Sequence, residues 1–353
     1  MKNSVTKQHQ FASDNCSGMC PEALKYLIEA NADHEVSYGD DHWTETACNS
    51  FRTIFETDCD AFFVFTGTAA NSLALASLCR SYHAIICNEN SHIETDECGA
   101  PEFFSGGSKL LLGKGQNGKL DPKSIEDILG NGREIHFPKP KVVSLTQSTE
   151  LGTVYTQAEL LEIYKVTKRN NLRLHMDGAR FANALVTLDV TPKEISWQCG
   201  IDVLCFGGVK NGLAVGEVIL FFNKQMAEDF AYRCKQAGQL SSKMRFLAAP
   251  WVGLLKDNVW LRNAKHSNQS AAILESQIKQ IPELKILYPR EANAVFVQMP
   301  ENISEALYRM GWHFYSFISD DCIRLMCSWD TTEESIHEFI SDVKSCLAGK
   351  HTS

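Results

Sequence analysis

One lysine of the chain stands in a setting that packing explains poorly. Lys210 lies in the stretch Phe206-Gly-Gly-Val-Lys-Asn-Gly212, directly after a strand-like apolar run. A Schiff-base lysine needs freedom to swing and a desolvated setting, which lowers its pKa so that it can attack a carbonyl carbon. The pattern indicates a lysine that forms a Schiff base. An ordinary lysine on a solvated face is the alternative interpretation.

A carboxylate earlier in the chain ends another apolar run. Asp177 belongs to the stretch His175-Met-Asp-Gly-Ala-Arg180. A side chain at the carboxyl end of a parallel strand faces the ligand crevice of its sheet. There a carboxylate would keep the ring nitrogen of a pyridine cofactor protonated and make the ring an electron sink. Arg180 could hold a carboxylate or the phenolate oxygen of that cofactor. The alternative interpretation of Asp177 is that it only caps the following helix.

A run of small residues, Thr66-Gly-Thr-Ala-Ala-Asn71, lies between a strand-like and a helix-like segment. Small side chains let backbone N–H groups approach an anion, and a helix N-terminus adds partial positive charge. The run therefore predicts a phosphate site, with a tight strand-to-helix turn as the alternative. The chain lacks the glycine patterns of nucleoside triphosphate and dinucleotide sites, which counts against those ligands.

These three features need a scaffold that brings distant segments together. Strand-like runs cover residues 61–65, 83–88, 141–146, 173–176 and 203–206, and helix-like segments cover residues 21–30, 45–55, 72–80, 158–170 and 181–185. Alternating apolar strands and helices predict an α/β fold with a mainly parallel sheet covered on both faces.

The C-terminal third has a different pattern. A long helical stretch over about 256–281 precedes strand-like runs at 294–298, 312–317 and 323–326 and a closing helix over 332–347. This order predicts a small α+β domain. We therefore expect an N-terminal arm over residues 1–20, a large domain over 21–255 and a small domain over 256–353.

Composition narrows the classes of partner. The net charge of −9 and the absence of a basic cluster argue against nucleic acid. The apolar runs are too short to span a membrane, and the polar N-terminus shows no secretory signal. Thirteen cysteines, an odd number scattered through apolar segments, favour reduced thiols in a cytoplasmic protein. Cys16 and Cys20 have no second Cys or His pair nearby, so we expect no metal site.

In this order the motifs resemble the threonine aldolase/β-eliminating lyase family of fold-type I pyridoxal phosphate (PLP) enzymes, close to its low-specificity L-threonine aldolases. The resemblance covers nearly the whole chain and rests on seven places: Phe11–Asn15, Tyr38–Asp41, Gly67–Asn71, Ser91-His92, His175–Arg180, Lys210–Gly212 and Arg324. It implies a large domain with a mainly parallel seven-stranded sheet and a small α+β C-terminal domain. It also implies a homodimer or homotetramer with shared active sites.

The resemblance assigns residues to the cofactor. Lys210 would bind PLP covalently, Asp177 would pair with the ring nitrogen and His92 would stack on the ring face. An isolated histidine would more often be a structural hydrogen-bonding residue. The phosphate would contact Gly67, Thr68 and Ala69, with Lys243 or Arg245 as an added cation.

The resemblance also assigns residues to the substrate. Ser13, Arg180 and Arg324 would clamp its carboxylate, and Tyr38 would reach the site of a neighbouring subunit. Arg324 lies in the strand-like run Cys322–Met326, where an arginine among apolar neighbours needs an anionic partner. A surface salt bridge is the alternative interpretation for Arg324.

One position departs from the pattern of the family. Many members have a histidine within the turn 148–152 that is thought to contact the substrate hydroxyl, but this chain has Glu150. In the subgroup that the chain most resembles, the candidates are His136 and Asp96 instead. His136 lies beside Phe137-Pro138, and the alternative interpretation is that its role is only structural. The identity of the general base is therefore left open.

The implied reaction is a retro-aldol cleavage of L-threonine, L-allo-threonine or other β-hydroxy-α-amino acids to glycine and an aldehyde, a step of threonine catabolism and glycine formation. Another PLP-dependent β-eliminating lyase on the same fold is one alternative. A binding protein without activity is a second, and the joint presence of Lys210, Asp177 and Arg324 counts against it.

Overall fold

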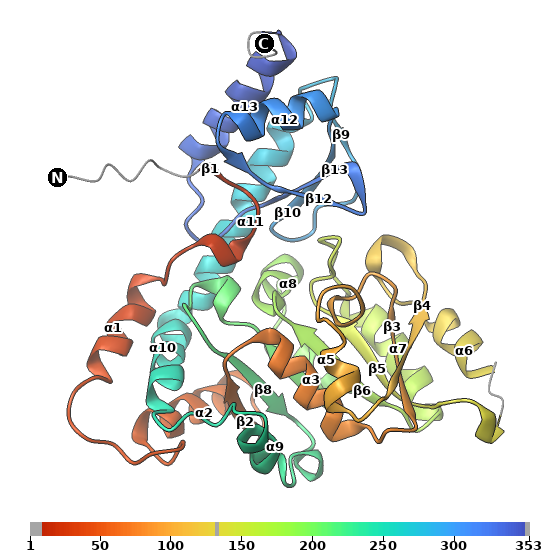
Figure 1. Cartoon of the computed structure of the whole chain (residues 1–353). Coiled ribbons are helices and arrows are strands. Elements are labelled where there is room, and N and C mark those ends of the chain that lie inside the picture. Colours follow the sequence, from red (N-terminus) through yellow and green to blue (C-terminus); the bar gives the residue numbers. More distant parts are fainter. Residues whose placement is uncertain (1–8, 131–133, 350–353) are drawn as a thin grey trace.

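A seven-stranded sheet forms the centre of the larger part of the molecule (Figure 1). The computed structural model describes residues 9–130 and 134–349. The strand order is β2-β8-β7-β6-β5-β3-β4. In chain order these strands are β2 (Asp60–Val64), β3 (His83–Asn88), β4 (Lys109–Gly113), β5 (Lys139–Thr146), β6 (Arg173–Gly178), β7 (Val203–Phe206) and β8 (Glu217–Phe221).

Six of the seven strands run in one direction. β3 pairs in parallel with β4 and β5, β5 with β6, and β6 with β7. β8 runs antiparallel to both of its neighbours, β7 and β2. The predicted fold class, a mainly parallel sheet with a small second sheet, is confirmed. Thr146, Asp177 and Cys205 are register partners, so the carboxyl ends of three strands stand level.

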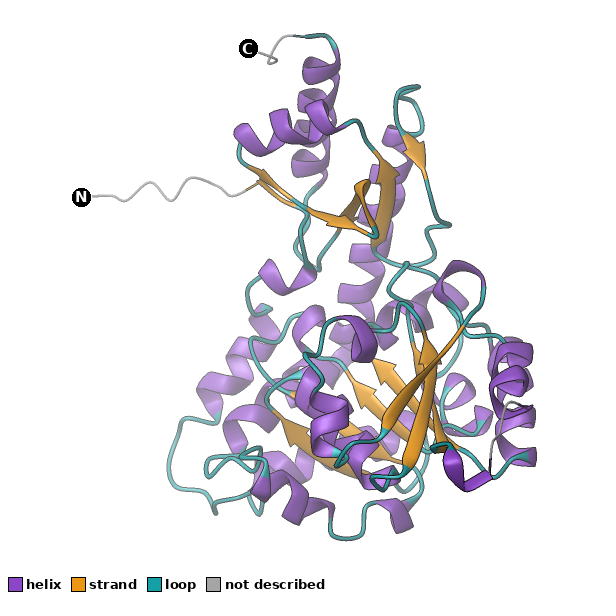
Figure 2. Cartoon of the chain, turned by 45° about the vertical axis from the view of Figure 1, so that its right-hand side comes forward, coloured by secondary structure: helices purple, strands orange, loops and turns teal. Residues whose placement is uncertain are grey.

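Helices cover both faces of this sheet (Figure 2). Alternate strand residues face opposite sides, and they fall into two apolar clusters, one with helices α3 and α9 and one with α2, α7, α8 and α10. The helices of this part are α1 (Pro21–Glu29), α2 (His42–Phe55), α3 (Gly67–Leu78), α4 (His92–Thr95), α5 (Ala100–Phe104), α6 (Pro122–Gly130), α7 (Gln157–Arg169), α8 (Phe181–Leu188), α9 (Phe230–Gln236) and α10 (Arg245–Leu255).

Helix α11 (Val259–Ile278) runs from the larger part into the smaller one (Figure 1). There a four-stranded antiparallel sheet, in the order β12-β13-β10-β9, packs with α11, α12 (Glu301–Arg309) and α13 (Glu333–Leu347). Its strands are β9 (Lys285–Ile286), β10 (Ala294–Gln298), β12 (Tyr315–Phe317) and β13 (Ser319–Met326). The limits assigned to the domains stay a prediction.

The N-terminal arm binds the smaller part before it enters the larger one. β1 (His9–Gln10) pairs in parallel with β11 (Trp312–His313), and Phe11 packs in the core of the smaller part. The carbonyl of Phe11 accepts a hydrogen bond from the backbone N–H of Met326. Residues 1–8 of the predicted arm lie outside the described residues.

Two local predictions need correction. The predicted turn 66–71 is the first turn of α3, because the Thr66 hydroxyl caps the helix by accepting from the Ala69 N–H. The predicted strand 312–317 is two strands, since β11 pairs with β1 whereas β12 pairs with β13, and the buried Phe314 lies between them.

No helix in the described part of the chain is long and apolar enough to cross a membrane. All thirteen cysteines are free thiols.

Candidate active site

The Lys210 turn lies directly after β7 and is tightly packed. A Cβ on Gly207 would lie 2.4 Å from the Ala179 carbonyl oxygen, and one on Gly208 would lie 2.5 Å from the Trp251 ring. These two glycines therefore allow close packing of the turn. Lys210 follows in a 3-10 turn over Val209–Asn211.

Charged groups around Lys210 decide its proton affinity. Burial, followed by the positive charge of Arg180, lowers the pKa of Lys210, although nearby carboxylates oppose the shift. One of these carboxylates is Glu217 at the start of β8, which accepts hydrogen bonds from the backbone N–H groups of Gly208 and Val209. Burial raises the pKa of Glu217 to about 7. The turn that carries Lys210 thus rests on a buried carboxyl group.

Asp177 is held at the end of β6 by two donors. Its Oδ1 accepts from the Ala179 N–H at 2.9 Å and its Oδ2 from the Asn71 amide at 2.8 Å. Burial opposes ionisation, but the charges of His92 and Lys210 together with these hydrogen bonds hold the pKa of Asp177 below its usual value. Asp177 is therefore an oriented carboxylate, suited to pair with a cation.

His92 begins α4 and is fixed through its ring. Its Nδ1 lies 2.8 Å from Oε1 of Glu97, and the same oxygen accepts from the Asn71 amide at 2.8 Å. This hydrogen bond to Glu97, against the effect of burial, raises the pKa of His92. Asp96, whose side chain is 84% exposed, lies 3.7 Å from Nε2. The structure thus brings His92, Asp96 and Asp177 together.

Within the described residues, one group of three potential metal ligands lies here: His92, Glu97 and Asp177, with ligand atoms within 4.8 Å of one another. The Asn71 amide donates to both carboxylates and the Ala179 N–H donates to Asp177, so hydrogen bonds already use one oxygen of Glu97 and both oxygens of Asp177. That this site binds no metal ion stays a prediction.

Arg180 is engaged by a carboxylate of the N-terminal arm. Its Nε and one terminal nitrogen donate to the two oxygens of Asp14 at 2.7 and 2.8 Å, a bidentate pair. The Asn293 amide also donates to Asp14. Burial opposes ionisation of Asp14, but Arg180 holds the pKa of that carboxyl below its usual value. Ser13 lies beside this pair and caps a 3-10 turn.

Arg324 is a second cation at this place, and it has few hydrogen-bond partners. It lies in β13 opposite Phe296, and one terminal nitrogen donates weakly, at 3.4 Å, to the Ala12 carbonyl. Its Nε is buried without a hydrogen-bond partner in the described residues. The rings of Tyr315 and Phe317 lie against the guanidinium group. A buried donor without a partner is costly, so this geometry fits an anionic ligand.

The predicted phosphate site lies at the N-terminus of α3. The first N–H groups of a helix have no partner within it. The helix starts with Gly67 and Thr68, and a Cβ added at Gly67 would meet nothing within 4 Å. Lys243 is exposed, whereas Arg245 donates to the carbonyl of Asp33. Phosphate binding by this helix end remains a prediction.

Two predicted residues form no hydrogen bond or ion pair with this group in the part of the chain that the structure describes. His136 is exposed in a 3-10 turn before β5. Thr146, at the other end of β5, stands level with Asp177. At the usual rise of a strand, Lys139 and Thr146 are about 23 Å apart, so His136 lies far from Asp177. Tyr38 is exposed with a positive φ, and its ring lies 4.4 Å below the Lys235 amine. Their proposed roles stay untested.

His175, in the same motif as Asp177, is a core residue. Its ring nitrogens contact the Ser144 hydroxyl at 2.9 Å and the Cys205 sulfur at 3.3 Å. Burial lowers the pKa of His175 to about 4. The motif thus divides into a packing residue and residues that face the site.

This shift predicts how acid affects stability. Native His175 binds its proton less readily than the unfolded chain does, so stability is full above about pH 6.5 and is lost as the pH falls toward 4. Relative to His175→Asn, we expect the wild type to lose on the order of 2 to 3 kcal/mol over this range. Urea unfolding at several pH values measures it, and parallel curves for the two proteins would contradict it.

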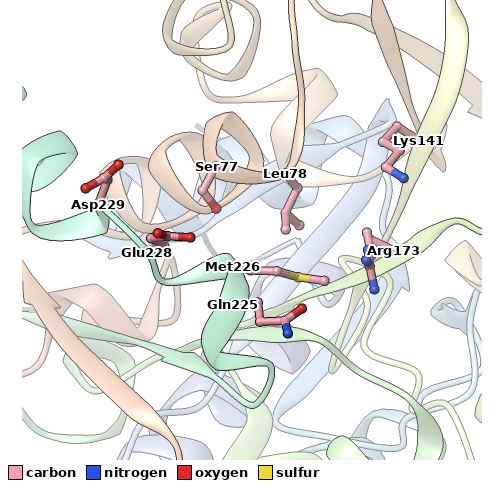
Figure 3. A pocket seen from close by; sticks show the side chains of 8 residues that line it. All are labelled: Ser77, Leu78, Lys141, Arg173, Gln225, Met226, Glu228 and Asp229. Carbon is pink, nitrogen blue, oxygen red and sulfur yellow. The ribbon is translucent and has the colours of Figure 1, made fainter.

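A depression elsewhere on the surface is not part of this site. Figure 3 shows Lys141 and Arg173 on one side and Glu228 and Asp229 on the other. Lys141 and Arg173 stand at the amino ends of β5 and β6, whereas Asp177 stands at a carboxyl end. The depression therefore lies at the opposite end of the sheet from Lys210.

Comparison with known proteins assigns the family. The model of the family described as "Beta-eliminating lyase" matches residues 10–302. The chain belongs to the β-eliminating lyase family. This lyase is 57% identical to the low specificity L-threonine aldolase of Pseudomonas sp. strain NCIMB 10558, over 97% of this chain and 99% of that one. It is 59% identical to the protein of the same name from Pseudomonas aeruginosa, over 95% and 97%.

A solved structure agrees with these relatives. The structure of a threonine aldolase from Leishmania major superposes on the lyase with a TM-score of 0.90, at 30% identity, and the match covers 96% of this chain and 99% of that one. The family resemblance that the sequence indicated is confirmed.

Several site residues of the lyase were not predicted from the sequence. Asp14 and Asn71 lie inside motifs that carried the resemblance, so they could have been found there. Glu217 is an acid at the head of an apolar strand, which is an unusual place for a charge. Glu97 has no local signal, because its role depends on contacts with His92 and Asn71.

Proposed function

We propose that the chain cleaves L-threonine, L-allo-threonine and related β-hydroxy-α-amino acids to glycine and an aldehyde with PLP as cofactor. The observation that carries this proposal is one site in which Lys210, Asp177 and His92 converge beside the partly unpaired Arg324. The names of relatives that are 57 and 59% identical support the reaction.

The residues present fit PLP. Lys210 has the lowered pKa that covalent binding of an aldehyde needs. Asp177 carries a carboxylate for the ring nitrogen, and α3 offers open N–H groups for the phosphate at Gly67. PLP, when bound, supplies a protonated ring that takes up the electron pair left on Cα as the Cα–Cβ bond breaks.

The side chains would then share the remaining work. Asp177 would keep the ring nitrogen protonated, and His92, fixed by Glu97, would lie against the ring face. Arg324 would bind the substrate carboxylate and so set which bond at Cα stands perpendicular to the ring. Lys210, displaced by the substrate amine, would move protons at Cα.

Replacing Arg324 tests the carboxylate contact. In Arg324→Ala we expect KM for L-threonine to rise, and kcat/KM to fall about 30-fold or more, because loss of one partner of a buried charge pair costs about 2 kcal/mol or more. Steady-state kinetics measure it. Arg309→Ala, an exposed arginine on α12, is the matched control and should behave as wild type. An unchanged KM in Arg324→Ala would remove Arg324 from the substrate site.

Product analysis tests the function itself. Purified protein loaded with PLP is given L-threonine, L-allo-threonine, L-phenylserine and L-serine, and glycine and the carbonyl products are identified. Glycine plus acetaldehyde from threonine is expected. Pyruvate from serine without glycine from threonine would favour the β-elimination alternative. A protein that takes up no PLP would exclude both.

Assembly and location are part of the proposal. We propose a cytoplasmic homodimer or homotetramer in which Tyr38 reaches the site of a partner, and its exposed position supports this role. Sedimentation of wild type and Tyr38→Phe, together with kinetics, tests it.

A further inference from the structure

Glu150 is a carboxyl group in the site to which the roles above give no task. It lies in the turn that follows β5, where the Thr149 N–H donates to the Thr153 carbonyl at 2.9 Å. Leu151 of this turn packs against the smaller part near Phe296, and the Gly152 carbonyl accepts from the Glu291 N–H. The turn is thus fixed from both parts of the molecule.

The Glu150 side chain points to the start of α4. Its Oε1 accepts from the His92 backbone N–H at 2.7 Å, and the helix has no cap from Ser91. The other oxygen, Oε2, accepts no hydrogen bond from another residue that the structure describes, and it is not among the fully buried unpaired atoms. One oxygen therefore anchors the side chain to α4, while no other residue that the structure describes donates to the second.

The surroundings suit a proton acceptor. Burial, followed by the negative charge of Asp177, raises the pKa of Glu150 to about 7. A base works best with a pKa near the working pH. The charged and titratable groups that act on Glu150 or feel its charge come from several elements: His92, Asp177, Arg180, Cys87 and Tyr155.

The other candidate bases are less well placed. Nδ1 of His92 is taken by Glu97, and His136 lies at the far end of β5. Asp96 is exposed to solvent, and water screens its charge.

We propose that Oε2 of Glu150 accepts the proton of the substrate β-hydroxyl group. This inference rests on the proposed function and names the residue that serves it. As the O–H proton passes to Glu150, the C–O bond becomes a carbonyl, the Cα–Cβ bond breaks, and its electron pair stays with Cα. A proton then adds to Cα to give glycine, and the Glu150 proton returns to solvent with the aldehyde.

The test separates hydroxyl chemistry from chemistry at Cα. Exchange of the α-hydrogen of glycine with deuterium from solvent needs the cofactor but no hydroxyl group. For Glu150→Gln, we expect threonine cleavage to fall about 10² to 10⁴-fold, the usual range for a general base, while glycine exchange stays within about 3-fold of wild type. The amide oxygen of glutamine can still accept from the His92 N–H, so the fold should persist.

Four further readouts keep the test specific. The visible absorbance of bound PLP and thermal unfolding of the cofactor-free protein should match wild type in Glu150→Gln. Cleavage by wild type should fall as the pH drops below about 7, because Glu150 then holds a proton, and this limb should vanish in Glu150→Gln. Glu150→Asp, which keeps a carboxylate, should recover part of the loss.

The outcomes are distinct. Equal loss of cleavage and glycine exchange would reduce Glu150 to a cap that positions His92 and overturn the proposal. Cleavage lost in Asp96→Asn but kept in Glu150→Gln would move the role to Asp96. Glu94→Gln, an exposed neighbour on α4, is the control and should change neither rate. If wild type exchanges glycine but cleaves no threonine, the proposed function fails independently of Glu150.

Discussion

Lys210→Ala should abolish cleavage and remove the visible absorbance of bound PLP. The loss should exceed the roughly 10² to 10⁴-fold that one general acid or base contributes, because in the proposed function Lys210 would both hold the cofactor and move protons at Cα. In wild type, borohydride reduction should fix PLP to the protein, and peptide mapping should place it on Lys210. The tightly packed turn, with Gly208 against Trp251, should leave folding intact after this substitution.

The control for Lys210 is another lysine. Lys265→Ala removes an exposed lysine of α11 and should leave absorbance and activity unchanged. Reduced protein that carries PLP on a lysine other than Lys210 would contradict the assignment. Full cleavage by Lys210→Ala would contradict the reaction scheme.

Asp177→Asn should give the second large effect. The substitution removes the charge that we propose pairs with the ring nitrogen, and it also places an NH₂ group opposite either the Asn71 amide or the Ala179 N–H. By comparison with the loss of one preorganised electrostatic group, we expect cleavage to fall about 10² to 10³-fold. PLP should still bind through Lys210, with a shifted absorbance. Rates and spectra on the same sample measure both.

Asp189→Asn is the matched control for Asp177. Asp189 ends α8 in the left-handed region, which asparagine adopts readily. This variant should keep wild-type rates. A rate in Asp177→Asn that stays within a few fold of wild type would show that the ring nitrogen needs no carboxylate here.

The sequence by itself determined the fold class, and it singled out Lys210 as the proposed cofactor lysine. Apolar strands such as Val203–Phe206 and the helices between them follow local patterning, which the structure keeps. The motif around Asp177 and the glycines before Lys210 carry their signal in adjacent residues. Helix α10 was missed because Pro250 and Gly253 are helix-breaking types. Close contact of Gly253 with the Glu22 carbonyl of α1 explains its presence.

Only the tertiary structure decided how the site residues divide their work. Arg180 was expected at the substrate, yet Asp14, far away in sequence, binds it bidentately, and Arg324 is left with an unpaired nitrogen. In the sequence, Glu150 stood out only because many family members have a histidine in this turn. Its hydrogen bond from the His92 backbone N–H places it in the site. Such roles depend on burial and on charges from other strands and helices. These long-range contacts have no local pattern, so residue types and spacing could not reveal them.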